Sequence, residues 1–167
     1  KAILNTVHAM TSTQALVDGP AKDFRKGRAA GLNIIPSTTG AAIATTLVHP
    51  ELTDKFDGMA MRVPVPVGSI VDVTFIASRD TTVEEINQAL ISAAGEARWK
   101  NIFAATDEPI VSSDIIGSRV GSIADLSFTR VVDGNLVKVL AWYDNETSYT
   151  QTLVEHVAAA ARHISKS

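Results

Sequence analysis

The chain has 167 residues, of which 46% are hydrophobic and 20% charged, so we expect one domain over residues 1–167 with a core of its own. The formal net charge of -3 and the pI near 5.8 provide no basic field, so neither nucleic acid nor an anionic membrane is an expected partner. Cysteine is absent, which excludes disulfides, thiolate metal ligands and a thiol nucleophile within these residues.

The N-terminal segment 1–7 predicts a strand that is already under way at the first residue, without an initiator Met or a preceding loop signal. We therefore expect the chain to be part of a longer protein. The segment also lacks the basic region and apolar block of a signal peptide, and no apolar run in the chain is as long as a membrane span. A cytoplasmic location without a membrane partner is the expectation.

A long irregular segment follows the first strand. Residues 11–33 show neither the helical nor the strand period and contain Gly19, Gly27 and Gly31. Loops of this length usually have a function. Beyond the loop, residues 41–48 predict a short apolar helix that ends before Pro50.

The second half contains the strongest periodic signals. Residues 69–78 alternate between apolar and polar positions and predict a strand. Residues 82–85 form a capping-box pattern, and the apolar spacing after them predicts an amphipathic helix that ends near Gly95.

The last third predicts a hairpin and a helix. Residues 131–142 have the apolar, turn, apolar order of a hairpin around Asp133-Gly134-Asn135. A long helix from about Glu146 carries one apolar stripe, with Tyr149, Leu153, Val157, Ala161 and Ile164. Because strands cluster instead of alternating with helices, we predict an α+β domain with a mixed, largely antiparallel sheet packed against helices.

His8 stands at the end of the first predicted strand, where side chains are often presented to a cleft. An imidazole can accept or donate a proton near neutral pH, but a lone histidine is more often a structural hydrogen-bonding residue. The other histidines have no spacing that indicates a metal site, so no metal is expected.

Two features could bind an anion. Thr39 and Gly40 precede the short helix, where backbone N–H groups and hydroxyls favour a phosphate, although simple N-capping by Thr39 is the favoured local interpretation. Arg62 lies in an apolar strand and must reach solvent or an anion, and a structural salt bridge is an equal alternative.

The segment 142–149 crosses from a strand into the last helix. Its composition indicates a hairpin edge followed by a helix cap. The amide of Asn145 could also bind a carboxamide on a ligand, because it offers both a donor and an acceptor.

Four motifs in this order resemble the catalytic domain of phosphorylating glyceraldehyde-3-phosphate dehydrogenase. They are His8-Ala9-Met10-Thr11, residues 34–42 (IIPSTTGAA), residues 58–64 (GMAMRVP) and residues 142–149 (WYDNETSY). The resemblance runs essentially from end to end. It implies a glycolytic oxidoreductase in which a cysteine attacks the aldehyde, hydride passes to a nicotinamide cofactor, and inorganic phosphate releases the acyl group as 1,3-bisphosphoglycerate.

The resemblance also implies a role for each candidate residue. His8 would be the acid/base residue that activates the thiol. Thr11 and Arg62 would hold the phosphate of glyceraldehyde 3-phosphate, and Thr39 with Gly40 would hold inorganic phosphate. Asn145 would bind the nicotinamide carboxamide, and Tyr149 would lie close to that ring.

The resemblance further implies a homotetramer, in which residues 10–33 cross to a neighbouring subunit beside its cofactor. Pro20 stands where NAD-preferring members carry proline, so NAD is favoured over NADP. Ser148 replaces a glycine of the last motif.

The family's NAD-binding Rossmann domain and its nucleophilic cysteine would precede Lys1 and are absent from this chain. We therefore expect the chain alone to be inactive and to bind cofactor poorly. Two alternatives stay open. One is an enzyme similar to erythrose-4-phosphate dehydrogenase, against which the Thr39-Gly40 pair argues. The other is a non-catalytic anion-binding or assembly module, against which the start within a strand argues.

Overall fold

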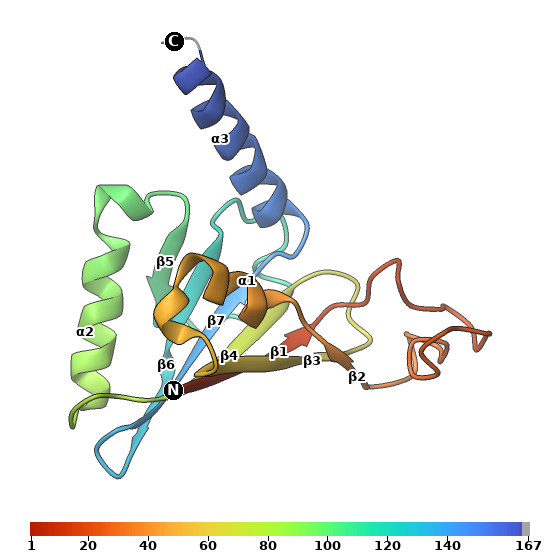
Figure 1. Ribbon diagram of the computed structural model, residues 1–167, viewed down its shortest axis with the longest axis horizontal. Coiled ribbons are helices and arrows are strands. Elements are labelled where there is room, and N and C mark those ends of the chain that lie inside the picture. The colour runs from red at the N-terminus through yellow and green to blue at the C-terminus, as the bar shows by residue number, and fades with distance from the viewer. Residues whose placement is uncertain (165–167) are drawn as a thin grey trace.

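The computed structural model describes residues 1–164, which form one seven-stranded sheet with three α-helices and two 3₁₀ turns (Figure 1). The strands are β1 (Ala2–His8), β2 (Ile35–Thr38), β3 (Phe56–Arg62), β4 (Ser69–Ile76), β5 (Phe103–Thr106), β6 (Ser122–Val132) and β7 (Leu136–Tyr143). The helices are α1 (Ala41–Val48), α2 (Val83–Ala94) and α3 (Thr147–Ile164), and the 3₁₀ turns are η1 (Pro50–Leu52) and η2 (Ala97–Trp99).

The strand order is β2-β3-β1-β4-β7-β6-β5. The β1–β3 and β5–β6 pairs are parallel, and the other four neighbouring pairs are antiparallel. This arrangement confirms the predicted α+β class with a mixed, largely antiparallel sheet.

The elements with a strong local signal form where the sequence predicts them. Helix α1 has the predicted bounds, and α2 begins after Thr82, whose hydroxyl accepts the N–H of Glu85. Strands β6 and β7 form the predicted hairpin, in which Asp133 and Gly134 both adopt positive φ. Residues 9–34 contain no helix or strand, as the missing period predicts.

The sequence did not predict β2, β5 or the first part of β6. Strands β2 and β5 are the two edges of the sheet, and each has four residues, too few to establish a period. Strand β6 begins at Ser122, and its pairing with β7 is irregular between Asp125 and Arg130. Such an irregularity interrupts the alternation by which a strand is recognised.

The sidedness of β1 positions the site. Because side chains alternate along a strand, Leu4, Thr6 and His8 lie on one face of the sheet. Helix α1 packs on β3, the neighbour of β1. The core is thin: among residues 1–164, the fully buried apolar side chains are mostly alanines.

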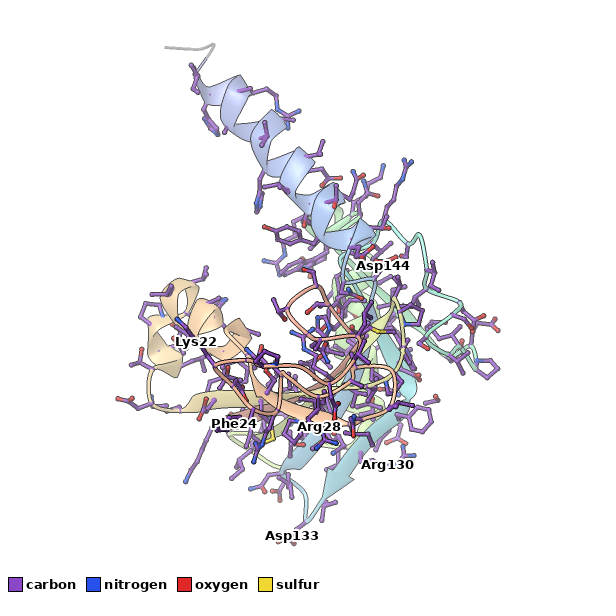
Figure 2. All side chains as sticks on the ribbon, turned by 90° about the vertical axis from the view of Figure 1, so that its right-hand side faces the viewer. Lys22, Phe24, Arg28, Arg130, Asp133 and Asp144 are labelled. Atoms are coloured by element: carbon purple, nitrogen blue, oxygen red, sulfur yellow. The ribbon has the colours of Figure 1, made fainter. Side chains whose placement is uncertain are left out.

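Two parts of the chain extend away from the sheet. Residues 9–34 form an extended loop at one side of the sheet (Figure 1), and Figure 2 labels Lys22, Phe24 and Arg28 on it. Helix α3 starts at the sheet with its N-terminal end and projects away from it (Figure 1). The predicted stripe of α3 from Tyr149 to Ile164 is exposed, and Phe24 is 90% exposed. No helix of residues 1–164 combines the length and the apolarity needed to cross a bilayer.

Asp144 anchors the base of α3 (Figure 2). This residue is 1% exposed, and its carboxylate accepts N–H groups from Gly117, Glu146 and Thr147 at 2.8 Å each. Burial raises the pKa of Asp144, but the three N–H donors outweigh burial, so the pKa is lowered overall. A charged carboxylate thus closes the first turn of α3.

Candidate active site

His8 and Arg62 are the last residues of two neighbouring parallel strands and are direct partners in their register. Parallel strands end at the same edge of a sheet, so both side chains are presented to one place. A cavity of about 420 Å³, hereafter the Arg62 cavity, opens there. It is lined by Leu4, Thr6, His8, Thr38, Thr39, Gly40, Ala41, Ala60, Arg62, Val71 and Tyr143.

The lining of the Arg62 cavity suits an anion. It contains one guanidinium, three threonines and the start of α1, and no carboxylate. Four of the five residues predicted to carry the acid/base and phosphate roles meet here: His8, Thr39, Gly40 and Arg62. Thr11 lines neither this cavity nor the second one, and its hydroxyl lies 2.9 Å from that of Thr13.

Arg62 contacts nitrogen and carbonyl partners. Its Nη1 lies 2.7 Å from Nδ1 of His8 and donates to the carbonyl of Ala9 at 3.1 Å. None of the ion pairs formed within residues 1–164 includes Arg62, so the salt-bridge alternative is not observed. Within the described residues its positive charge thus has no carboxylate partner.

The start of α1 differs from the expected N-cap. The capping position is Gly40, with helical φ of -83° and no side-chain cap bond, and not Thr39. The hydroxyl of Thr39 accepts the N–H of Ala41 at 3.2 Å. Strand β2 ends at Thr38, so Thr39 follows it directly at the end of the sheet. The hydroxyl of Thr39 therefore lies one residue before Gly40, the N-cap of α1.

Within residues 1–164, no contact requires glycine at position 40. A Cβ added to Gly40 would meet no atom within 4 Å, and its φ is open to any residue. The absence of a side chain leaves the N-terminus of α1 open to a group in the cavity.

A second cavity of about 310 Å³, hereafter the Asn145 cavity, lies where β7 meets α3. It is lined by His8, Gly121, Tyr143, Asp144, Asn145, Ser148, Tyr149 and Thr152. Both residues predicted to contact the cofactor, Asn145 and Tyr149, are therefore in one place.

The amide of Asn145 is oriented by the backbone. Its Oδ1 accepts the N–H of Gly68 at 3.0 Å, and the hydroxyl of Ser69 lies 3.4 Å away. Because a backbone N–H can only donate, the oxygen of the amide must face Gly68. The NH₂ group remains for a ligand, so Asn145 offers a donor and not the donor–acceptor pair considered from the sequence.

Gly68 holds this contact through an unusual backbone. Its φ is +93°, and an added Cβ would lie 2.6 Å from the carbonyl oxygen of Ser112. Only glycine fits both conditions. Ser148, which also lines the Asn145 cavity, is 3% exposed, and its hydroxyl donates to the carbonyl of Ser118.

His8 and Tyr143 line both cavities, so the imidazole is shared by the Arg62 cavity and the Asn145 cavity. Sequence reasoning missed Tyr143 and Thr6, which line the Arg62 cavity together. Tyr143 is the last residue of β7, the second strand of the predicted hairpin, and a hairpin pattern does not indicate a functional residue. Its position directly before Asp144-Asn145 is the one signal that could have indicated it.

The environment of His8 favours a neutral imidazole. Burial lowers the pKa of His8, the carbonyl of Ala9 raises it, and the charge of Arg62 lowers it, with a net decrease. A neutral ring has a free lone pair at neutral pH and can accept a proton. Residues 1–164 contain no group of three histidine, aspartate or glutamate side chains that could hold a metal ion.

Comparison with known proteins places this geometry in context. Residues 1–145 match the family model described as glyceraldehyde 3-phosphate dehydrogenase, C-terminal domain. The chain is 49% identical over 161 residues to a glyceraldehyde-3-phosphate dehydrogenase of Geobacillus stearothermophilus, covering 96% of this chain and 48% of that protein. It is 50% identical over 153 residues to glyceraldehyde-3-phosphate dehydrogenase 1 of Streptomyces avermitilis, covering 92% and 45%. It is 48% identical over 164 residues to a glyceraldehyde-3-phosphate dehydrogenase of Mycobacterium avium, covering 98% of this chain and 48% of that protein. The chain thus spans about half the length of these relatives.

Proposed function

The chain belongs to the glyceraldehyde-3-phosphate dehydrogenase family, as its C-terminal domain, and we propose that it forms the catalytic domain of an NAD-dependent, phosphorylating enzyme of this kind. The substrates would be glyceraldehyde 3-phosphate and inorganic phosphate. The observation that carries the proposal is the position of His8, which lines both the Arg62 cavity and the Asn145 cavity. One imidazole then reaches a bound phosphate ester and a bound nicotinamide.

His8 acts as the acid/base residue. Burial and the charge of Arg62 lower the pKa of His8, so the ring is neutral and can take a proton from a thiol. The chain has no cysteine, so the thiol comes from a separate N-terminal domain, which also supplies the dinucleotide fold. In this proposal residues 1–167 are one domain of a two-domain enzyme.

The Arg62 cavity binds phosphate groups. Arg62 supplies a charged donor, and Thr39 and Gly40 supply a hydroxyl and the open start of α1. Thr6 also lines this cavity and adds a further hydroxyl. Thr11 remains a prediction from the resemblance, since its hydroxyl pairs with Thr13.

The Asn145 cavity fits the carboxamide of a nicotinamide. The amide NH₂ of Asn145 is the group left to donate to a carboxamide oxygen, and Tyr149, which lines the same cavity, offers a ring that is 67% exposed. When bound there, NAD would supply hydride acceptance. The preference for NAD over NADP rests on Pro20 alone.

The exposed apolar surface supports a larger assembly. Val157 is 62% exposed on α3, and Leu16 and Phe24 are 78% and 90% exposed on the irregular loop. Single exposed apolar residues are ordinary, but a whole helical stripe indicates an interface. We assign the stripe of α3 to the N-terminal domain and residues 10–33 to a neighbouring subunit of a homotetramer.

Titration of inorganic phosphate into the chain by calorimetry tests this proposal. Arg62→Ala and Thr39→Ala should each weaken binding about tenfold, which corresponds to the loss of one charge-assisted or helix-terminal contact. Arg28→Ala is the matched control, because Arg28 pairs with Asp18 on the exposed loop. Equal binding in all four proteins would contradict the anion site. In the whole enzyme, His8→Asn should lower kcat by about 10²- to 10⁴-fold.

A further inference from the structure

The dipeptide Asp-Gly occurs at residues 18–19, 57–58 and 133–134 of the chain. An aspartate that precedes glycine is prone to form a succinimide, because glycine has no side chain to hinder attack by its backbone nitrogen on the aspartate carboxyl. The three pairs have the same chemistry in different surroundings. The tertiary structure therefore decides which of them reacts.

At Asp18 and Gly19, both reacting groups are engaged. The carboxylate of Asp18 accepts hydrogen bonds from the N–H of Ala29 at 2.8 Å and from Nε of Arg28 at 3.0 Å. The N–H of Gly19 donates to the carbonyl of Gly27 at 2.9 Å. The N–H of Ala29 and the charge of Arg28 lower the pKa of Asp18, so the neutral carboxyl that closes the ring is scarce.

Asp57 and Gly58 lie within β3 and are held by the sheet. They pair with Ile3 and Leu4 in the parallel β1–β3 ladder. The N–H of Gly58 donates to Oδ1 of Asp57 at 2.7 Å, and an added Cβ on Gly58 would lie 2.8 Å from the carbonyl oxygen of Leu4. Closure of the five-membered ring turns the peptide unit between the two residues out of the extended conformation. The ladder and the close packing on β1 oppose that rotation.

Asp133 and Gly134, in the turn between β6 and β7, are free at both reacting groups. Asp133 is exposed, and its carboxylate has no hydrogen-bond or ion-pair partner in the described part of the chain. Within residues 1–164, neither the carbonyl of Asp133 nor the N–H of Gly134 forms a hydrogen bond. The turn is fixed instead by the carbonyl groups of Gly134 and Asn135, which accept the N–H groups of Thr81 and Ala77 at 2.8 Å each. The peptide unit between Asp133 and Gly134 can therefore rotate without the loss of a hydrogen bond.

We propose that Asp133 is the site at which this chain forms isoaspartate, while the fold protects Asp18 and Asp57. The backbone nitrogen of Gly134 forms a bond to Cγ of Asp133, and the carboxyl hydroxyl leaves with the amide proton as water. Water then opens the succinimide. Attack at Cγ restores aspartate, whereas attack at the main-chain carbonyl leaves the chain linked through the side chain, with a free α-carboxylate.

The turn itself imposes this reactive pair. Gly134 has a φ of +74°, and an added Cβ would lie 2.9 Å from Oδ1 of Asp80, so another residue at position 134 would be strained. The isoaspartyl link adds one methylene to the main chain directly before Gly134. It displaces the carbonyl groups that bind Ala77 and Thr81, and so loosens the hairpin from the segment that precedes α2.

Ageing of the unmodified chain at neutral pH in water enriched in heavy oxygen tests the proposal. Opening of the succinimide incorporates heavy oxygen at the residue that reacted, and electron-transfer fragmentation of the digested peptides distinguishes isoaspartate from aspartate. Isoaspartyl methyltransferase with labelled S-adenosylmethionine methylates the free α-carboxylate and measures the total. Asp133→Glu keeps the charge but cannot close a five-membered ring, and Asp57→Glu is the matched control. A parallel sample in urea gives the reactivity of the unfolded chain.

In the folded chain we expect isoaspartate at Asp133 and about tenfold less at Asp18 and Asp57, where more than one interaction must break before the ring can close. In urea the three sites should react at similar rates. Asp133→Glu should lose the methyltransferase signal of the folded chain, and Asp57→Glu should keep it. Isoaspartate mainly at Asp18 or Asp57, or equally at all three sites of the folded chain, would overturn the proposal, and this comparison requires no variant to fold. A folded chain that stays free of isoaspartate while the urea sample reacts would overturn it as well.

Discussion

The hydroxyl of Tyr143 lies 2.7 Å from Oγ1 of Thr6, while the ring of Tyr143 contacts the imidazole of His8 at an interplanar angle of 73°. The bond joins β7 to β1 across β4, which lies between them in the sheet. Thr6 is buried, and its hydroxyl also donates to the carbonyl of Ile70. Tyr143, which lines both cavities, is thus held by a hydrogen bond to β1 and contacts His8 through its ring.

Tyr143→Phe should lower the free energy of unfolding by about 0.5 to 1.5 kcal/mol, because it removes one partly buried hydrogen bond and keeps the ring. Urea denaturation followed by circular dichroism measures the change. Tyr149→Phe is the control, since Tyr149 is 67% exposed, and it should change stability by no more than about 0.5 kcal/mol. Equal losses in both variants would contradict a structural role for the bond between Tyr143 and Thr6.

Gly40→Asp should weaken phosphate binding about tenfold or more without unfolding the chain. The new carboxylate stands at the start of α1, where it favours the helix but repels an anion in the Arg62 cavity. Gly31→Asp adds the same charge at another glycine whose Cβ position is open, outside the cavity. Calorimetry measures the phosphate affinity of both variants, and only Gly40→Asp should weaken it. Similar affinities in the two variants would mean that net charge, and not the position of the carboxylate, controls binding.

Asp144→Asn should lower the free energy of unfolding by about 1 to 3 kcal/mol at neutral pH, because the buried, charged acceptor of three backbone N–H groups becomes a neutral amide. Asp133→Asn, in the exposed hairpin turn, is the control and should have little effect. Thermal unfolding of the three proteins measures the difference.

The same carboxylate predicts a dependence on pH. The pKa of Asp144 is lowered in the folded chain from its ordinary value of 3.8, so its contribution is present in full above that value. The contribution is lost as the pH falls through the folded pKa. Stability of the unmodified chain should therefore decline below about pH 4 more steeply than that of Asp144→Asn. Parallel acid titrations of the two proteins would contradict this assignment.

Gly68→Ala should destabilise the chain by about 1 to 3 kcal/mol, because alanine at φ +93° is strained and its Cβ would meet the carbonyl of Ser112. If the backbone moved to relieve this contact, the N–H of residue 68, which orients the amide of Asn145, would move with it. Gly31→Ala, where an added Cβ meets no atom within 4 Å, should be neutral or slightly stabilising. Urea denaturation of both variants checks the contrast, and equal midpoints would count against strain at Gly68.

The chain alone should form no NADH from glyceraldehyde 3-phosphate, NAD and phosphate, since it contains no cysteine to attack the aldehyde. Absorbance of NADH at high protein concentration measures this directly. The whole enzyme of Geobacillus stearothermophilus serves as the positive control. Turnover that persists through repeated purification and is lost in His8→Asn would show that the reaction needs no thiol.

The elements that the sequence predicts well are those with a local cause. The bounds of α1 follow from an apolar run between Gly40 and Pro50, and the start of α2 follows from the capping hydroxyl of Thr82. The edge strands β2 and β5 have no such cause. Each forms because a longer strand lies beside it, and four residues cannot indicate that partner.

Residue types and their order along the chain determined the family, the class of fold and the identity of most candidate site residues. Only the tertiary structure decided how these residues meet. His8 and Arg62 are 54 residues apart, and they touch because β1 pairs with β3 in parallel register, a choice made by long-range packing. Likewise, the N–H of Gly68 fixes the amide of Asn145 across 77 residues of sequence, and Thr11, adjacent in the first motif, faces elsewhere. The register of a strand and the direction of a hydrogen bond depend on which distant segment of the chain packs beside the residue. A local pattern of residues does not contain that information.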